Sequence, residues 1–321
     1  MQQYGGACKL AAGFSPETVP VPQISVNGLA FEYESFGSAS RPAVVLIMGL
    51  GAQLVRWPLP FCNKLVERGF RVIRFDNRDI GLSAKMDGAP VPELATIVAA
   101  RMAGLPVRVP YTLDDMAADT VGLMDALQIE KAHIVGASMG GMIAQLVAAD
   151  HASHVLSLTS IMSTTGNPAL PPPTPAASAV LMARAPNPSD LDAYLQHSLN
   201  TLRVIGSPGA PFDEAAARER LTTEVKRNYN PAGFGRQLAA VTANGDRREK
   251  LRRIRTPTMV IHGTDDPLVP AAGGRDTAEN IPGAELRIIP GMGHDLPPQY
   301  QDQIVDAIVA IAKRADPNVT G

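Results

Sequence analysis

Short apolar runs separated by stretches with helical spacing dominate the hydrophobic pattern of this chain. A strand that is covered on both faces is mostly apolar along its whole length rather than alternating. Six short segments in which apolar residues dominate fit that description, at residues 43–48, 72–75, 132–135, 155–162, 258–262 and 284–289. They predict the strands of a mostly parallel sheet.

Helical patterns separate these runs. Residues 61–68, 142–149 and 300–313 have apolar positions at helical spacing, and Thr112 with Asp115 three residues later has the pattern of a helix N-cap. Strands that alternate with helices predict the α/β class, with a doubly wound sheet and helices on both of its faces.

The N-terminal part of the pattern is different. The dipeptide Asn27-Gly28 lies between the strand-like segments 24–26 and 30–35. This dipeptide favours a two-residue hairpin turn. We therefore expect the sheet to begin with an antiparallel pair.

The alternation stops after residue 162. Prolines are dense between Ser163 and Pro188, and no further strand pattern occurs before Thr258. Three helical patterns fill most of this interval, at residues 191–202, 214–226 and 234–244. We therefore predict a core made of residues 24–163 and 251–314, an inserted helical cap at residues 164–250, and an N-terminal tail at residues 1–23.

A Gly-x-Ser-x-Gly pattern follows the third strand at Gly136, Ser138 and Gly140. In a sharp strand-to-helix turn the serine hydroxyl is lifted off the sheet, and small residues are needed where strand and helix nearly touch. The pattern alone is weak, since it occurs by chance in roughly one chain in ten of this length. A glycine-rich turn with a solvated serine is the alternative interpretation.

Serine needs a base to accept its proton, and the base must be oriented by a third group. The ends of the last two predicted strands supply such groups. Asp265 and Asp266 follow the strand that ends at His262, and His294 follows the strand that ends near Ile289. Ligands bind at the carboxyl ends of parallel strands, so we expect these side chains to meet Ser138.

Composition and charge exclude other classes. The chain has 321 residues, 45% of them hydrophobic, and a net charge of −2. No basic run of the kind that binds nucleic acid occurs, and we interpret the densest basic stretch, residues 247–255, as a solvated helix end. No apolar segment is long enough to span a bilayer, and the first twenty residues lack the pattern of a signal peptide. We expect a soluble, cytoplasmic protein.

Cysteine and histidine usage argues against a metal site. Cys8 and Cys62 are the two cysteines, and we expect both to be free thiols. Neither Cys-x-x-Cys nor His-Glu-x-x-His occurs. We predict that the protein needs no metal and no organic cofactor.

The combination of Ser138, Asp266 and His294 in this order resembles the α/β-hydrolase family, from about residue 24 to residue 313. Two further segments, residues 48–51 and 75–79, resemble the branch that contains aclacinomycin methylesterase-like esterases. The resemblance implies a mostly parallel sheet with an inserted helical cap, and a Ser-His-Asp triad. It favours Asp266 as the acid, with Asp265 as the alternative.

The resemblance also implies an oxyanion hole. One donor is the amide of Met139, directly after the serine, and the other comes from the loop after the third strand of the family, here at Leu50, with Gly51 as the alternative. Many relatives have His-Gly where this chain has Met48-Gly49, so a side chain that braces this loop is missing.

Two other residues have competing interpretations. Arg78, between Asp76 and Asp79, is expected to form a structural ion pair rather than to act in catalysis. Trp57 is either a wall of the acyl pocket or an ordinary packing residue.

These patterns predict a serine hydrolase that cleaves a small-molecule carboxylic ester, with a small or medium hydrophobic group held under the cap. Lactone or carbon–carbon bond hydrolysis, cleavage at an N-terminal proline and cofactor-free perhydrolysis use the same triad and stay open, since the fold does not choose among them. A receptor that retains the triad is the alternative from a different class.

Overall fold

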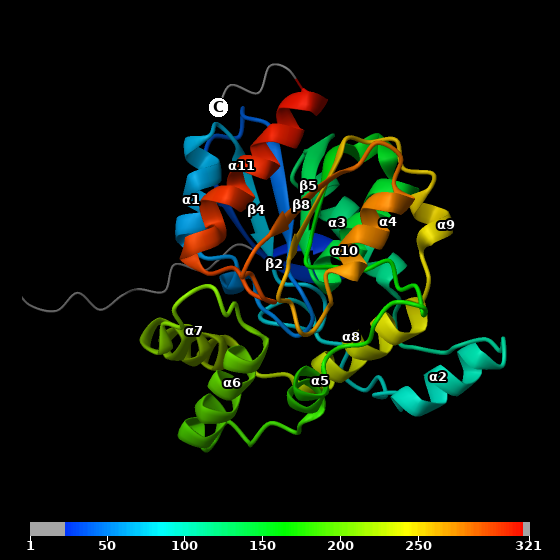
Figure 1. Ribbon diagram of the computed structural model, residues 1–321, viewed down its shortest axis with the longest axis vertical. Coiled ribbons are helices and arrows are strands. Elements are labelled where there is room, and N and C mark those ends of the chain that lie inside the picture. The colour runs from blue at the N-terminus through cyan, green and yellow to red at the C-terminus, as the bar shows by residue number, and fades with distance from the viewer. Residues whose placement is uncertain (1–22, 317–321) are drawn as a thin grey trace, which may run out of the picture.

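The computed structural model describes residues 23–316. In these residues eight strands form one sheet in the order β1-β2-β4-β3-β5-β6-β7-β8 (Figure 1). Their bounds are β1 Gln23–Val26, β2 Leu29–Phe36, β3 Ala43–Ile47, β4 Arg71–Phe75, β5 Ala132–Ala137, β6 Val155–Ile161, β7 Thr258–Gly263 and β8 Glu285–Ile289. The strands from β4 to β8 along this order are parallel, as the apolar runs predict.

The antiparallel part lies at the edge formed by β1 and β2. The two strands pair through Asn27-Gly28, both of which have positive φ, and β2 pairs antiparallel with β4. The predicted N-terminal hairpin is therefore confirmed.

Helices cover both faces of the sheet (Figure 1). One face carries α1 (Leu59–Glu67) and α11 (Pro298–Ala315), and the other carries α3 (Leu113–Ala126), α4 (Met139–Asp150) and α10 (Ala272–Asn280). The short α9 (Arg248–Leu251) packs against α4 and α10. Each face has its own apolar core, so the strands β3 to β7 between them are almost completely buried, whereas β1, β2 and β8 at the two edges are partly exposed.

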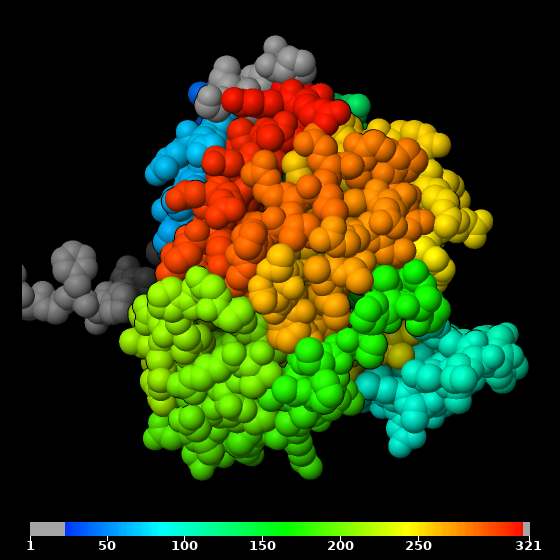
Figure 2. Space-filling view, in the orientation of Figure 1, coloured from blue at the N-terminus to red at the C-terminus, as the bar shows by residue number. Residues whose placement is uncertain are grey.

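The chain between β6 and β7 forms a helical layer below the sheet in Figure 1. It contains α5 (Pro175–Met182), α6 (Leu191–Ile205), α7 (Glu214–Arg227) and α8 (Pro231–Asn244). A small apolar cluster joins α6 to α7 and includes Leu199, which the core clusters do not contain. Figure 2 shows these helices pressed against the core, with the segment around α2 (Leu94–Met102) projecting beside them.

Three helices were not predicted, namely α2, α5 and α10. The apolar positions of α2 and α10 are too few or too evenly spread to show a helical face. The helix α5 begins inside the proline-rich segment, with Thr174 as its N-cap and Pro175 at the first position. Proline is well tolerated at that position because its missing N–H would have no partner there.

In the basic stretch 247–255 the other basic residues are exposed or half-exposed, as expected, but Arg247 differs from the expectation. Arg247 is buried and donates to Gln145, to Asn244 and to the carbonyl of Gly245. Burial lowers the pKa of its guanidinium to about 10. Arg247 therefore ties the end of the helical layer to α4 rather than belonging to a solvated surface.

Cys62 is a buried free thiol, whereas Cys8 lies outside the described residues. Between residues 23 and 316, none of the helices is long and apolar enough to cross a membrane.

Candidate active site

The chain bends sharply between β5 and α4, and Ser138 stands at the bend. Its backbone has φ 56° and ψ −120°. Residues other than glycine seldom adopt this conformation, and where they do it is often at a functional site. Its neighbours have no room for a side chain. A Cβ on Gly136 would lie 2.0 Å from the carbonyl oxygen of Gly140, and one on Gly140 would lie 2.0 Å from that of Ile47. Both glycines are therefore required by the close approach of strand and helix.

Strand β6 holds this bend in place. The amide of Ser138 donates to the carbonyl of Ile161 at 2.9 Å, and the hydroxyl of Ser163 donates to the carbonyl of Ser138 at 2.8 Å. The strained conformation is thus fixed from the neighbouring strand.

Three loops bring a hydroxyl, an imidazole and a carboxylate together. His294 Nε2 lies 3.0 Å from Ser138 Oγ, and His294 Nδ1 lies 2.7 Å from Asp266 Oδ2. These are hydrogen-bond distances between groups that lie 156 and 28 positions apart in the chain. The arrangement is a continuous relay from Asp266 to the serine hydroxyl.

Asp266 is held more firmly than its neighbour. Its Oδ1 accepts from the amides of Leu268 and Val269, at 2.9 and 2.8 Å. Burial raises the pKa of Asp266, but His294, the hydrogen bonds from His262 and His294, and the amide of Val269 outweigh it, so the pKa falls well below its usual range. Asp266 is therefore ionised at neutral pH, which keeps a proton on the facing nitrogen of His294.

Asp265 has a different position. It is exposed, and its Oδ2 accepts from the amide of Gly291 at 3.1 Å and from the hydroxyl of Thr264. This carboxylate joins the loop after β7 to the loop after β8, and it makes no contact with His294 among the described residues. The geometry therefore favours Asp266 over Asp265 as the partner of the histidine.

Two backbone amides near the serine are candidates for an oxyanion hole. Met139 is the first residue of α4, so its amide has no partner inside the helix. On the other side, a Cβ on Gly49 would lie 3.1 Å from the Cβ of Ser138, which places residues 49–51 against the serine. Within residues 23–316, the amide of Leu50 donates no hydrogen bond, whereas the amide of Gly51 donates to Gln237 Oε1 at 2.9 Å. Of these two amides, that of Leu50 is therefore the one that stays available to a ligand.

Gln237 holds the loop after β3, which lacks the bracing side chain that many relatives have at the position of Met48. Its Oε1 accepts from Gly51, and its Nε2 donates to the carbonyl of Arg78 at 2.9 Å. A second support comes from Asn77, whose side chain donates to the carbonyl of Met48 at 2.9 Å. The loop after β3 is thus held by α8 and by the loop after β4.

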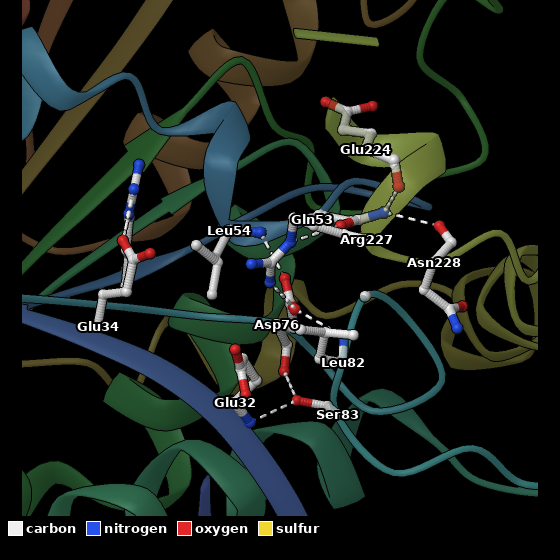
Figure 3. A network of polar contacts seen from close by, with 12 residues as sticks. Glu32, Glu34, Gln53, Leu54, Asp76, Leu82, Ser83, Glu224, Arg227 and Asn228 are labelled. Carbon is white, nitrogen blue, oxygen red and sulfur yellow. Dashed lines mark hydrogen bonds and ion pairs between the residues drawn. The ribbon is translucent and has the colours of Figure 1, made fainter. Parts of the chain in front are cut away.

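The loop after β4 joins the core to the helical layer. Figure 3 shows Asp76 accepting from the amides of Leu54 and Leu82 and from Arg227 of α7. Gln53 adds two hydrogen bonds to the end of the same helix, at the carbonyls of Glu224 and Asn228 (Figure 3). Asp76 is fully buried and Arg227 is 14% exposed, so this joint is shielded from water.

Asp79 makes the second joint. Both of its oxygens accept from Arg236 of α8, at 2.7 and 2.8 Å, and neither side chain is more than 3% exposed. Arg78, which lies between the two aspartates, pairs instead with Asp119 of α3. Arg78 therefore forms a structural ion pair, as expected, but with a partner that the local sequence does not indicate.

The histidine loop has its own support. The amide of His294 donates to the carbonyl of Ile205 at 2.7 Å, and the amide of Gly293 donates to the hydroxyl of Ser207 at 2.8 Å. Ser207 in turn donates to Asp295. The end of α6 and the residues after it therefore fix the position of the loop that carries His294.

A cavity of about 1690 Å³ lies between the bend and the helical layer. Ser138, Met139, Leu50 and His294 line its floor, and residues of α5 to α8 line its roof. Most small-molecule sites are smaller, roughly 300–1000 Å³. The sequence analysis predicted that the cavity holds a small or medium hydrophobic group. The cavity is larger than such a group requires.

Trp57 does not line this cavity. It is fully buried and stacks on Phe61 of α1, with ring centroids 5.3 Å apart. The packing interpretation describes this position, and the structure gives no support to a pocket role for Trp57.

The residues that the sequence analysis missed are Gln237, Ser207 and His262. Gln237 and Ser207 lie in the helical insertion, where no motif marks them. His262 is the penultimate residue of β7, and its Nε2 lies 2.7 Å from the carbonyl of Val269 and 3.4 Å from Asp266 Oδ2. Its place directly before the acid loop was the only local signal. Among residues 23–316, no cluster of three or more His, Cys, Asp or Glu side chains is arranged to hold a metal ion.

The fold and this geometry agree with comparisons to known proteins. The family model described as the alpha/beta hydrolase fold matches residues 42–298. Rhodomycin D methylesterase DnrP of Streptomyces peucetius is 28% identical over 92% of this chain and 99% of its own length. A putative carbamate hydrolase, RutD of Caulobacter sp., is 29% identical over 84% of this chain and 90% of its own.

A solved structure has the same fold. A meta-cleavage product hydrolase from Pseudomonas fluorescens superposes with a TM-score of 0.73, at 22% identity, over 92% of this chain and 98% of that one. The match of the family model spans most of the chain, from β3 to the start of α11. The chain therefore belongs to the α/β-hydrolase fold family.

Proposed function

We propose that this protein is a serine hydrolase that cleaves carboxylic esters through an acyl-enzyme. The observation that carries the proposal is the relay of 3.0 and 2.7 Å from Ser138 through His294 to Asp266, at a strained bend beside two unpaired amides. In this proposal Ser138 is the nucleophile, His294 the general base and acid, and Asp266 the group that orients the imidazole.

The proposed reaction begins with proton transfer. His294 Nε2 accepts the hydroxyl proton as Ser138 Oγ bonds to the ester carbon, and the carbonyl electrons move onto oxygen. The amides of Met139 and Leu50 donate to this oxyanion, and a donor of this kind typically contributes about 10²–10³ in rate. The carbon–oxygen bond to the alcohol then breaks, and His294 returns the proton to the leaving oxygen.

Water completes the cycle. It attacks the acyl carbon while His294 accepts one of its protons, and the proton then returns to Ser138 Oγ as the acid leaves. Asp266 stays ionised throughout, because its lowered pKa favours the charged form beside a protonated imidazole. No metal or organic cofactor takes part in the proposed steps.

The substrate proposal combines the cavity with the relatives. DnrP is a methylesterase by name, and a methyl group leaves most of a cavity of about 1690 Å³ empty. We therefore propose a small-molecule ester with a bulky acid part and a small alcohol. Helices α5 to α8 enclose the acid part, as the cap of residues 164–250 on a core of residues 24–163 and 251–314.

The nucleophile is tested by Ser138→Ala. A fluorescent fluorophosphonate should label the wild type and leave this variant unlabelled, and turnover of p-nitrophenyl and methyl esters should fall to the residual ~10³–10⁴ over water that such a site retains. Unchanged turnover in Ser138→Ala would exclude the proposed nucleophile. Rapid labelling of the wild type without turnover of any ester or lactone would favour the alternative that the protein is a receptor that retains the triad.

A further inference from the structure

The cavity contains one arginine with an unusual environment. Arg220 lies on α7 and lines the cavity, and its Nε is shielded from solvent without a hydrogen-bond partner. Within residues 23–316, the guanidinium of Arg220 makes no hydrogen bond and no ion pair. Burial, together with repulsion from Arg56, lowers the pKa of its guanidinium. A buried polar group without a partner is costly, so this arginine needs an explanation.

Nearby carboxylates do not satisfy Arg220. Glu224 lies one turn further along α7, but both of its oxygens accept from Arg56. Asp295 interacts with Arg220 only beyond ion-pair distance, and its carboxylate accepts from Ser207. Burial also raises the pKa of Asp295, which weakens it as a counterion.

The other cations on the cavity wall either form an ion pair or are exposed to water, and Arg220 does neither. Lys64 pairs with Asp302, and Arg203 pairs with Glu214 and stacks on Phe212. The remaining one, Arg184, is exposed, so water solvates it. Arg220 alone among these cavity cations combines a shielded nitrogen with the absence of an ion-pair partner in the described part of the chain.

The residues that line the cavity include more cationic than acidic side chains. The chain as a whole carries −2, but the lining has five cationic and three acidic residues: Arg56, Lys64, Arg184, Arg203 and Arg220 against Asp213, Glu224 and Asp295. Three of the five cations pair with carboxylates, namely Arg56 with Glu224, Lys64 with Asp302 and Arg203 with Glu214. Among the described residues, Arg220 is the shielded cation of the lining that is left without a carboxylate.

The backbone around Arg220 is fixed. The last turn of α7 is held by Gln53 through the carbonyls of Glu224 and Asn228, and by the ion pair of Arg227 with Asp76 (Figure 3). Because the backbone of this helix is already held, binding a ligand needs no ordering of the backbone, and the planar set of donors of the guanidinium is itself pre-organised for an oxyanion.

We propose that Arg220 is a specificity-determining residue that binds a carboxylate, or a similar oxyanion, on the part of the ester that is not cleaved. This rests on the proposed function, because it assigns a substrate class to the same cavity. The ligand would supply the acceptors that the protein does not, and a charge-assisted pair with arginine is both strong and directional.

Matched esters test this proposal. Monomethyl adipate carries a carboxylate on its acid part, and methyl adipamate carries a neutral amide of nearly the same shape. We expect the wild type to prefer the anionic ester by at least about tenfold in kcat/KM. The acetate esters of 4-hydroxybutyrate and of its amide place the same two groups on the alcohol part, and so show on which side of the ester the anion binds.

The variant is Arg220→Gln, and the matched control is Arg203→Gln, a cavity arginine that already has a partner. Arg220→Gln should abolish the preference for the anion and leave turnover of the neutral ester within about twofold of the wild type, whereas Arg203→Gln should retain the preference. A wild type without a preference in either pair, or equal losses on both esters in Arg220→Gln, would overturn the assignment.

Binding without turnover separates this inference from the proposed function. Adipate should raise the Tm of Ser138→Ala and should not raise that of the double variant Ser138→Ala, Arg220→Gln. If no ester is hydrolysed but this difference in Tm appears, the proposed reaction fails while the anion site stands. If esters are hydrolysed but adipate shifts both variants equally, the anion site alone fails.

Discussion

The carboxyl edge of the sheet and the helical layer over it contribute different things to the site. The edge supplies the groups that meet at Ser138, each in a loop that follows a parallel strand of the sheet. The layer supplies their supports, since Gln237 holds the loop after β3 and Ser207 holds the histidine loop. The layer is therefore a structural part of the site and more than a cover over it.

The joint between the two regions supports this view. Arg227 and Arg236 enter the core and pair with Asp76 and Asp79, both fully buried. A lid that opens as a rigid body would have to break these ion pairs and expose unpaired charges. We infer that substrates enter while α7 and α8 stay attached. Four expected results test how the edge and the layer divide these roles.

The largest effect is expected at the edge. Asp266→Asn should lower kcat by about 10⁴-fold, because an amide neither holds the required tautomer of His294 nor stabilises its protonated form. Steady-state kinetics on a p-nitrophenyl ester measures this. Asp265→Asn is the matched control and should cost far less, since Asp265 only joins two loops; the reverse order of effects would move the acid by one residue.

The second effect is expected at the joint and is one of stability. Asp79→Asn removes the charge that faces buried Arg236, and should lower the free energy of unfolding by about 3–5 kcal/mol. Urea denaturation measures it. Asp302→Asn breaks an exposed pair with Lys64 and should cost less than about 1 kcal/mol. If both variants lowered the free energy of unfolding by the same small amount, the ion pair of Asp79 with Arg236 would not be what holds the helical layer on the core.

The same variant has a predictable pH dependence. Burial raises the pKa of Asp79, but the hydrogen bonds from Arg236 and from the amide of Met86 outweigh it, and the net pKa is lowered. A lowered pKa in the folded state stabilises the protein above the unfolded pKa of about 3.9, and this contribution is lost as the pH falls below it. The stability difference between wild type and Asp79→Asn should therefore shrink between about pH 5 and about pH 3. A constant difference would contradict the ionised pair.

The smallest effect is expected within the layer. Gln237→Leu releases the amide of Gly51 and should lower kcat by about tenfold with little change in KM, because the loop that carries Leu50 loses its brace. Asn230→Ala is the control: it removes the N-cap of α8 and a hydrogen bond to the carbonyl of Asp79, but leaves Gly51 held. Equal losses of kcat in both variants would show that Gln237 acts through stability alone.

Much of the fold and of the reacting groups follows from the sequence. The apolar runs, the hairpin at Asn27-Gly28 and the glycines around Ser138 are local patterns, since periodicity and turn geometry act over a few residues. The order of Ser138, Asp266 and His294 along the chain then predicted three loops at one edge. The geometry places these three side chains in one relay, while their catalytic roles stay proposals.

Other features were decided only by tertiary structure. The choice between Asp265 and Asp266 depends on which carboxylate faces His294, and the partner of Arg78 turned out to be Asp119 rather than a neighbour in the chain. The supports from Gln237 depend on hydrogen bonds between residues more than 150 positions apart. The place of Arg220 on the cavity wall, without a hydrogen-bond partner for its Nε among the described residues, likewise depends on how the helices dock. Such contacts are fixed by how the layers dock, and dispersed polar residues in helices leave no local pattern that would reveal them.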